Sequence, residues 1–188
     1  RHAIRGIVNG ENFQAVLVDT PGIHKPKTLL GHRLNAVVGD EGAGKTRFLR
    51  LLSELESDAL WFDLRLSNHD ALTPLEFWHH LQSQCPRWNE TLRSQLCDAL
   101  DLNDHLHKQL FMLSAGSRRK VGLVALLVSG AKFVCLDQPF SALDQASISV
   151  LVDFLNDMSQ DTSRAWLVAD YVADPRLDWV SLIELDGP

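Results

Sequence analysis

The eight residues from Gly39 to Thr46 have the types and spacing of a phosphate-binding loop. They fit the pattern G-x-x-x-x-G-K-[ST] at every fixed position. Glycines allow backbone N–H groups to converge on phosphate oxygens, and the start of a following helix adds partial positive charge. In this pattern the lysine reaches the β- and γ-phosphates and the threonine hydroxyl binds Mg²⁺. The loop therefore predicts binding of a nucleotide with magnesium, through Gly39, Asp40, Glu41, Gly42, Ala43, Gly44, Lys45 and Thr46.

An apolar run that ends in an acid follows farther along the chain. It reads Phe133-Val134-Cys135-Leu136-Asp137, and we interpret it as a buried strand with a carboxylate at its C-terminal end. Beside a phosphate loop, a carboxylate in this position can hold Mg²⁺. We therefore expect Thr46 and Asp137 to share the metal ion.

The elements around these residues alternate between strands and helices. Leu34 to Val38 favours a strand, and Thr46 to Glu56 has apolar residues at helical spacing. Helical periodicity continues through residues 73–113, with a break at Pro86, and through 117–128 and 148–158; buried strands are predicted at 132–136 and 165–169. This order is typical of an α/β fold with a mainly parallel sheet. We therefore predict the fold of a P-loop NTPase.

Composition excludes several classes of protein. The chain has 188 residues, of which 45% are hydrophobic and 22% charged, so it is neither disordered nor collagen-like and can form one sizeable core. The net charge of −6 has the wrong sign for a nucleic-acid binder. The three widely spaced cysteines favour buried thiols in a reducing cytoplasm. The longest apolar stretch, Val121 to Val128, is far shorter than the roughly 20 residues of a membrane helix.

Further motifs, in a fixed order, resemble the ATP-binding cassette (ABC) ATPases. Leu113-Ser114-Ala115-Gly116 resembles the LSGGQ signature of that family. The stretch from Asp137 to Asp144 resembles the end of its Walker B motif and its D-loop, DEPFSALD. Leu72-Thr73-Pro74-Leu75-Glu76 is similar to the segment that opens the helical subdomain of the family. The resemblance covers about residues 34–186.

The resemblance implies a domain plan and a set of partners. It implies an ABC-type ATP-binding domain over 36–188, with a helical subdomain at about 72–116 inserted between the Walker A phosphate loop and the signature. It also implies MgATP as the ligand and a head-to-tail dimer with a second cassette, identical or different. The dimer would drive a membrane permease subunit, from the cytoplasmic side of the inner membrane, with no nucleic-acid partner.

The same resemblance gives roles to residues outside the phosphate loop. In the family, each ATP lies between the phosphate loop of one subunit and the signature of the other. Ser114 and the backbone of Gly116 would contact the γ-phosphate on the partner, and Asp144 would connect the two sites. Arg47 stands where the family usually has a hydroxyl residue of the nucleotide site. The basic run after the signature, residues 118–120, could bind phosphate, but we favour its interpretation as a solvated helix face.

The catalytic positions depart from the family pattern. Gln138 stands where the family has the glutamate that takes a proton from the attacking water, and Asp170 aligns with the switch histidine. An amide can orient water but cannot act as its base, and an acid repels the γ-phosphate. No glutamine occurs between Trp61 and Asp70, where the Q-loop of the family falls. We therefore predict MgATP binding with impaired hydrolysis; the alternative is an active ATPase that uses another acid, such as Asp170, as its base.

Residues 1–35 resemble a different family, the Era-type bacterial GTPases. Ile4 to Val8 and Phe13 to Val18 predict a strand hairpin, and Asp19-Thr20-Pro21-Gly22 matches the DxxG switch motif of that family. A GTPase also needs a phosphate loop upstream and N-K-x-D downstream, and this chain has neither. Residues 1–35 are either an Era fragment in a chimeric chain, which we favour because the match is long, or a cassette terminus that converged on this sequence. The alternative function is an Era-like GTPase fragment or a chimeric GTP-binding protein.

Overall fold

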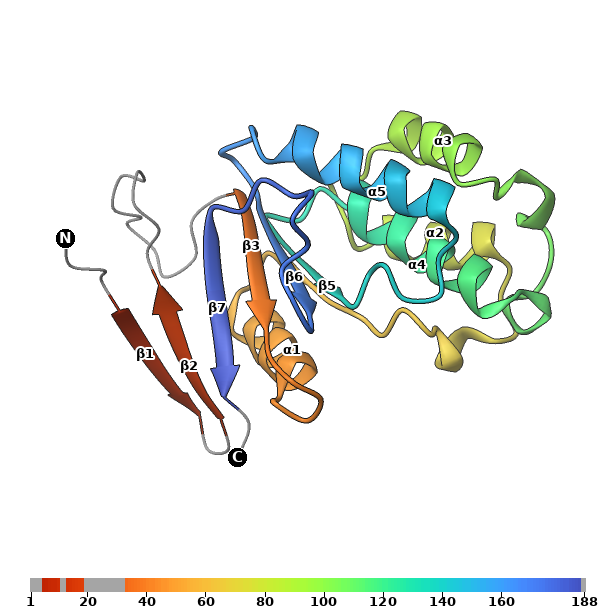
Figure 1. Cartoon of the computed structure of the whole chain (residues 1–188). Coiled ribbons are helices and arrows are strands. Elements are labelled where there is room, and N and C mark those ends of the chain that lie inside the picture. The colour runs from red at the N-terminus through yellow and green to blue at the C-terminus, as the bar shows by residue number, and fades with distance from the viewer. Residues whose placement is uncertain (1–4, 11–12, 19–32, 187–188) are drawn as a thin grey trace.

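A computed structural model describes residues 5–10, 13–18 and 33–186. One sheet runs through the described residues (Figure 1). In spatial order its strands are β1 (Arg5–Gly10), β2 (Phe13–Val18), β7 (Ser181–Asp186), β3 (Arg33–Val38), β6 (Ala165–Asp170), β5 (Phe133–Asp137) and β4 (Ala59–Leu60). The strands from β7 to β4 run parallel, and β1 and β2 add an antiparallel hairpin at one edge. The predicted α/β fold with a mainly parallel sheet is confirmed.

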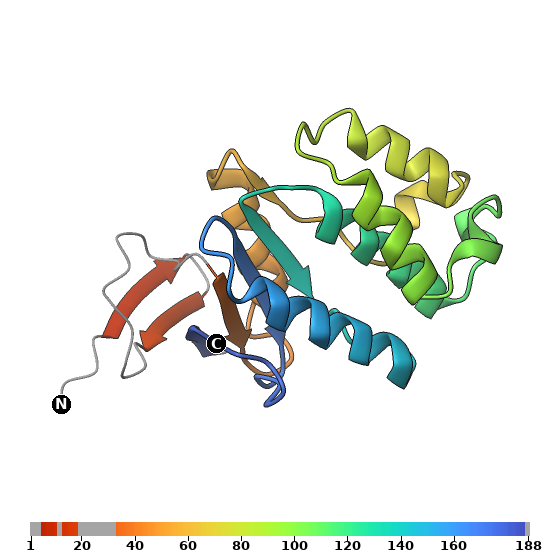
Figure 2. The same cartoon turned by 90° about the horizontal axis from the view of Figure 1, so that it is seen from above.

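Helices cover both faces of the parallel strands, as Figure 2 shows. Helix α1 (Lys45–Leu55) lies on one face, where Leu49 packs with Val37 and Leu167. Helix α5 (Gln145–Met158) lies on the opposite face, where Leu155 packs with Trp166. Alternate residues of β6 thus belong to two separate cores, which explains why this strand is apolar from Ala165 to Ala169.

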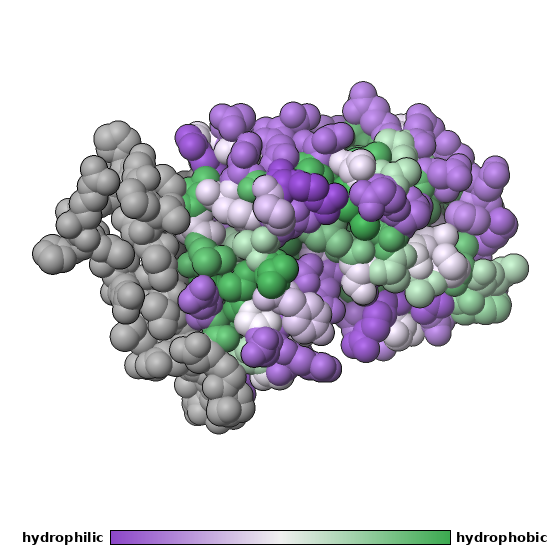
Figure 3. Space-filling model, in the orientation of Figure 1, coloured by the Kyte–Doolittle hydropathy of each residue, from purple (hydrophilic) through white to green (hydrophobic). Residues whose placement is uncertain are grey.

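Three helices lie at the end of the sheet away from the hairpin (Figure 1): α2 (Pro74–Gln82), α3 (Glu90–Ala99) and α4 (Ala115–Val128). The first two fall within the subdomain predicted at about 72–116, whose bounds stay a prediction. Thr73 caps α2, and the indole N–H of the buried Trp78 donates to the carbonyl of Val121 at 3.0 Å. The chain leaves the helix before Pro86 and starts the next after Asn89, so the predicted break is confirmed. Figure 3 shows mainly hydrophilic side chains over α3 and α5.

The predicted strands and helices are present, with ends shifted by a few residues. The hairpin prediction holds for β1 and β2, while Ile4 and the switch motif at 19–22 lie outside the described residues. Strands β4 and β7 were not predicted.

Of the three thiols, Cys97 and Cys135 are buried, and burial raises the pKa of Cys135 to about 12. Within the described ranges, no helix is both long and apolar enough to cross a membrane.

The hairpin continues the sheet of the cassette-like part of the chain. Strand β2 pairs with β7 from Gln14 opposite Asp186 to Val18 opposite Leu182. Strand β7 in turn pairs with β3, which leads into the phosphate loop. A domain boundary between residues 35 and 36 stays a prediction. It would fall within β3, and strands from both sides of it share one sheet.

Candidate phosphate-binding site

The loop from Gly39 to Gly44 joins β3 to α1, as predicted from the sequence. Gly42 and Gly44 have φ angles of 83° and 91°, which glycine adopts without strain. At Gly39 a Cβ atom would lie 2.6 Å from the carbonyl oxygen of Leu185, so no side chain fits there. Gly44 is the N-cap of α1, and the first N–H groups of that helix therefore point into the loop.

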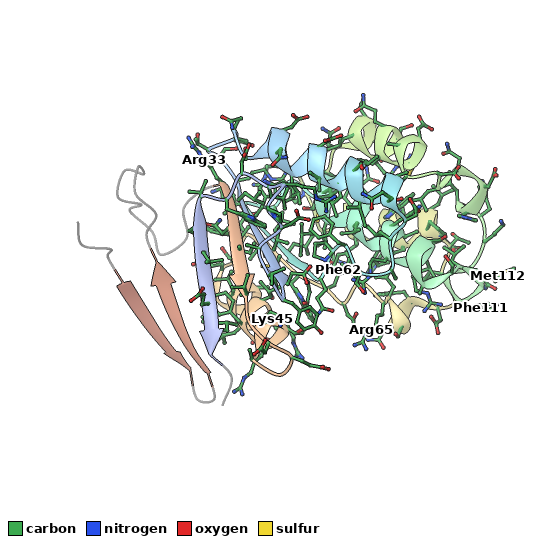
Figure 4. The ribbon with its side chains drawn as sticks, in the orientation of Figure 1. Arg33, Lys45, Phe62, Arg65, Phe111 and Met112 are labelled. Carbon is green, nitrogen blue, oxygen red and sulfur yellow. The ribbon has the colours of Figure 1, made fainter. Side chains whose placement is uncertain are left out.

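The ammonium group of Lys45 is buried within this loop. Its side chain lies at the carboxyl end of β3 (Figure 4), and the residue is only 6% exposed. Nζ donates to the carbonyl oxygens of Gly39 at 2.6 Å and Asp40 at 2.9 Å. The ring centroid of Tyr171 lies 4.5 Å from the same Nζ. An ammonium group has three donors, so two carbonyl bonds leave one N–H for a phosphate oxygen.

Thr46 and Asp137, the predicted metal-binding pair, are in direct contact. The hydroxyl of Thr46 donates to Oδ2 of Asp137 at 2.6 Å. Burial raises the pKa of the Asp137 carboxyl, and the nearby carboxylate of Asp63 raises it further. A bound cation would favour the ionised form instead. Among the described residues no cluster of three or more His, Cys, Asp or Glu side chains forms a metal site. Mg²⁺ takes one or two protein ligands and completes its shell with phosphate and water, so the two oxygen groups of Thr46 and Asp137 fit it.

A cavity of about 370 Å³ opens beside this pair. Gln138 lines it and lies at the position that the family pattern gives to the catalytic glutamate. Its backbone is fixed on both sides: its N–H donates to the carbonyl of Ala169 at 2.8 Å, and its own carbonyl accepts from Arg119 at 2.8 Å. The full lining is Thr46, Arg50, Trp61, Asp63, Leu64, Arg65, Arg119, Asp137 and Gln138.

Sequence reasoning missed several residues of this cavity. Asp63 lies in it, beside Asp137, although an aspartate is a poor substitute for the Q-loop glutamine and was not among the predicted site residues. Hydrogen bonds from Arg65 hold the pKa of Asp63 below its usual value. Arg119 also lines the cavity, and burial lowers the pKa of its guanidinium. Only the strand order brings these segments together, and no local pattern indicates it.

The interpretation of residues 118–120 as a solvated helix face is wrong. Arg118 pairs with Asp70 at 2.8 Å, and its side chain is 18% exposed. Lys120 pairs with Asp144 at 2.8 Å, and its side chain is 12% exposed. All three basic residues, Arg119 included, point towards neighbouring loops because α4 lies against the cavity and the start of α5.

The signature and D-loop residues gather at the starts of two helices. Ser114 is the exposed N-cap of α4 and accepts the N–H of Ser117 at 3.0 Å. At Gly116 a Cβ atom would lie 2.5 Å from the carbonyl oxygen of Ala142, so the signature packs directly on the D-loop. Asp144 is the N-cap of α5, and its bonds to Lys120 and Ser147 lower its pKa.

The remaining predicted residues lie around the phosphate loop. Asp40, Glu41 and Arg47 are exposed, with Arg47 in the first turn of α1. Asp170 ends β6, which pairs with the strand that leads into the loop. Its Oδ1 accepts the backbone N–H of Tyr171 at 2.8 Å. Ser114, Gly116 and Asp144 do not line the cavity beside Thr46.

Solved structures show the same arrangement of strands and helices. An ABC transporter ATP-binding protein from Pyrococcus furiosus matches with a TM-score of 0.69 and 15% identity, covering 95% of this chain and 93% of that one. An ATP-binding subunit of an ABC transporter matches with a TM-score of 0.66 and 16% identity, over 80% of this chain and 73% of that one. The chain has the fold of an ABC ATPase. No protein-family model matches its sequence.

The N-terminal part of this chain has a separate likeness. GTPase Era of Mycolicibacterium smegmatis is 68% identical over 40 residues, which are 21% of this chain and 13% of that protein. GTPase Era of Mycobacterium tuberculosis is 68% identical over 38 residues. The chain thus spans about 13% of the length of these curated relatives. The resemblance of a short N-terminal stretch to Era is confirmed.

Proposed function

We propose that this chain is the ATP-binding subunit of an ABC transporter and that it binds ATP with Mg²⁺. The observation that carries the proposal is the contact between Thr46 and Asp137 at 2.6 Å, next to the buried ammonium of Lys45. These three side chains come from the phosphate loop and a parallel strand, and they supply a phosphate-binding cation and two oxygen ligands for magnesium.

Hydrolysis by this site is slow under the same proposal. Gln138 lines the cavity next to Thr46 and Asp137. The family pattern has the base for the attacking water at this position of the sequence. An amide cannot accept the proton of that water. Asp63 is a weak base because Arg65 holds its pKa low, and Asp170 has one oxygen engaged with the backbone of Tyr171.

The partners we propose are a second cassette and a membrane permease, on the cytoplasmic side of the inner membrane. The exposed Ser114 caps α4, and the N-terminal end of this helix is suited to a phosphate on a second subunit. Phe111 and Met112 are adjacent on the helical subdomain, and they are 58% and 60% exposed (Figure 4). Neighbouring exposed apolar side chains of this size are typical of a protein interface.

Titration with nucleotides tests the proposal. Isothermal calorimetry should show MgATP binding by the wild type and a loss of at least tenfold in affinity for Lys45→Ala, since a charge-assisted bond to phosphate is lost. Lys132→Ala removes an exposed lysine far along the chain and is the matched control. Equal affinity in wild type and Lys45→Ala would refute the phosphate site.

The second candidate function is an Era-like GTP-binding fragment, which the 68% identity over 40 residues favours. The two functions differ in the base that they recognise. Competition titrations measure this difference. If GTP displaces bound ATP at a much lower concentration than ATP needs to displace bound GTP, the result supports the GTPase candidate. ABC-type binding predicts that ATP binds at least as well as GTP, because no N-K-x-D motif occurs in the sequence.

A further inference from the structure

Tyr171 directly follows β6, and its side chain lies against the lysine of the phosphate loop. Asp170, which aligns with the switch histidine, uses Oδ1 to accept the backbone N–H of Tyr171 at 2.8 Å. The ring of Tyr171 lies instead over Lys45, with 4.5 Å between its centroid and Nζ. The residue after the predicted switch position therefore makes the contact with the phosphate-binding lysine.

The register of the sheet fixes this placement. Strand β6 runs parallel to β3, and Asp170 pairs with Val38. Val38 directly precedes Gly39, the first residue of the phosphate loop, and Tyr171 directly follows Asp170. Both loops thus leave the sheet at the same level from adjacent strands. Tyr171 is 50% exposed, so part of this residue is accessible to a bound ligand.

A phosphate bound by Lys45 would be a neighbour of this ring. The carbonyls of Gly39 and Asp40 hold the Nζ at 2.6 and 2.9 Å. A phosphate oxygen must approach the same Nζ to about 2.8 Å, and Tyr171 already lies against that ammonium. The phenol hydroxyl can donate a proton in a hydrogen bond, whereas an ionised aspartate only accepts.

We propose that Tyr171 makes this site prefer nucleoside triphosphate over diphosphate, by donating a hydrogen bond from its hydroxyl to the γ-phosphate. The inference rests on the proposed nucleotide-binding function and adds the residue that reads the third phosphate. Tyr171 then supplies the donor that Asp170 lacks at the end of β6. Asp170 fixes the loop through its bond to the Tyr171 backbone.

Tyr171→Phe tests the inference, because it removes the hydroxyl and keeps the ring over Lys45. Dissociation constants for MgATP and MgADP are measured by calorimetry on the full chain. We expect MgATP to bind about tenfold more weakly and MgADP to bind as in the wild type, since a hydrogen bond to a charged group is lost only with the triphosphate. Tyr171→His, which keeps a ring donor, should retain part of the preference.

The matched control is Val172→Ala, in the next residue of the same loop, which is 72% exposed. It should bind both nucleotides like the wild type, and thermal unfolding should show all variants to be folded. An unchanged ratio of the two constants in Tyr171→Phe overturns the inference, as does an equal weakening for ATP and ADP. The inference is also overturned if Asp170→Asn loses the preference for MgATP over MgADP. Wild-type protein that binds neither nucleotide would refute the proposed function itself.

Discussion

In the proposed site, a proton and Mg²⁺ compete for the carboxylate of Asp137. Burial raises its pKa, the nearby Asp63 carboxylate raises it further, and the Thr46 hydroxyl, Arg119 and Lys45 act in the opposite direction. A raised pKa means that the folded protein binds this proton more tightly than the unfolded chain does. The ionised carboxylate is therefore destabilising above the raised pKa, and the cost is relieved as the pH falls through it.

We predict that affinity for MgATP falls on acidification, starting at a higher pH than the ordinary pKa of aspartate would give. The reason is that Mg²⁺ needs the ionised carboxylate and must displace the proton. Calorimetric titrations between pH 8 and about pH 4.5 measure the effect, and Asp137→Asn should lack this pH dependence. Affinity that stays constant down to the ordinary aspartate range would contradict the prediction.

Gln138 allows a second prediction at the scale of one residue. Gln138→Glu places a carboxylate in the cavity next to Thr46 and Asp137, where the backbone is already fixed by Ala169 and Arg119. Phosphate release should rise by about 10²- to 10⁴-fold, the usual contribution of a positioned general base. Brisk release by the wild type, with no gain in the variant, would show that another group serves as the base.

The starts of α4 and α5 form one unit at the scale of elements. Gly116 lies against the carbonyl of Ala142, and Asp144 caps α5 while it pairs with Lys120 of α4. Ala142 itself has a φ of 60°, a strained value for a residue with a side chain. The signature and the D-loop are therefore held in one relative position within a single subunit.

Gly116→Ala should destabilise this unit. Its Cβ atom would lie 2.5 Å from the Ala142 carbonyl oxygen, so the backbone must shift, at a cost of about 1–3 kcal/mol in the free energy of unfolding. Urea denaturation measures the change. Ser149→Ala, on the exposed side of α5, is the control and should change stability by less than about 0.5 kcal/mol. A Gly116→Ala variant as stable as the wild type would show that the two loops move apart freely.

The sequence predicted the elements around the phosphate loop well because their signals are local. A fixed glycine pattern marks the loop, and apolar periodicity marks α1, α4 and α5. Strand β4 has only two residues, too few for any periodicity. The positions of Asp63, Arg119 and Tyr171 next to the site depend on which strands are adjacent. That order is a property of the whole sheet, so these residues could not be found from spacing along the chain.

At the scale of the whole molecule, the stretch that resembles Era takes part in the sheet of an ABC-type fold. The hairpin of β1 and β2 covers the edge of β7. Strand β7 pairs with β3, and the carbonyl oxygen of its Leu185 lies beside Gly39. The hairpin is thus linked through two strands to the phosphate loop. Residues that match a different protein family complete the sheet edge next to the predicted nucleotide site.

Removal of residues 1–18 should therefore weaken the fold and expose the edge of β7. A bare strand edge offers unpaired N–H and C=O groups to other chains, so we expect self-association as well as a lower melting temperature. Light scattering and thermal unfolding measure both effects against the full chain. A truncated protein that stays monomeric and melts at the same temperature would contradict a structural role for the hairpin.

A crystal structure of the protein grown with Mg²⁺ and a non-hydrolysable ATP analogue tests the central claim most directly. The account predicts β- and γ-phosphates in the loop from Gly39 to Gly44, in contact with Lys45, and a magnesium ion bound by Thr46 and Asp137. An empty loop at saturating nucleotide, or a nucleotide bound elsewhere with Lys45 still on its two carbonyls, would contradict it.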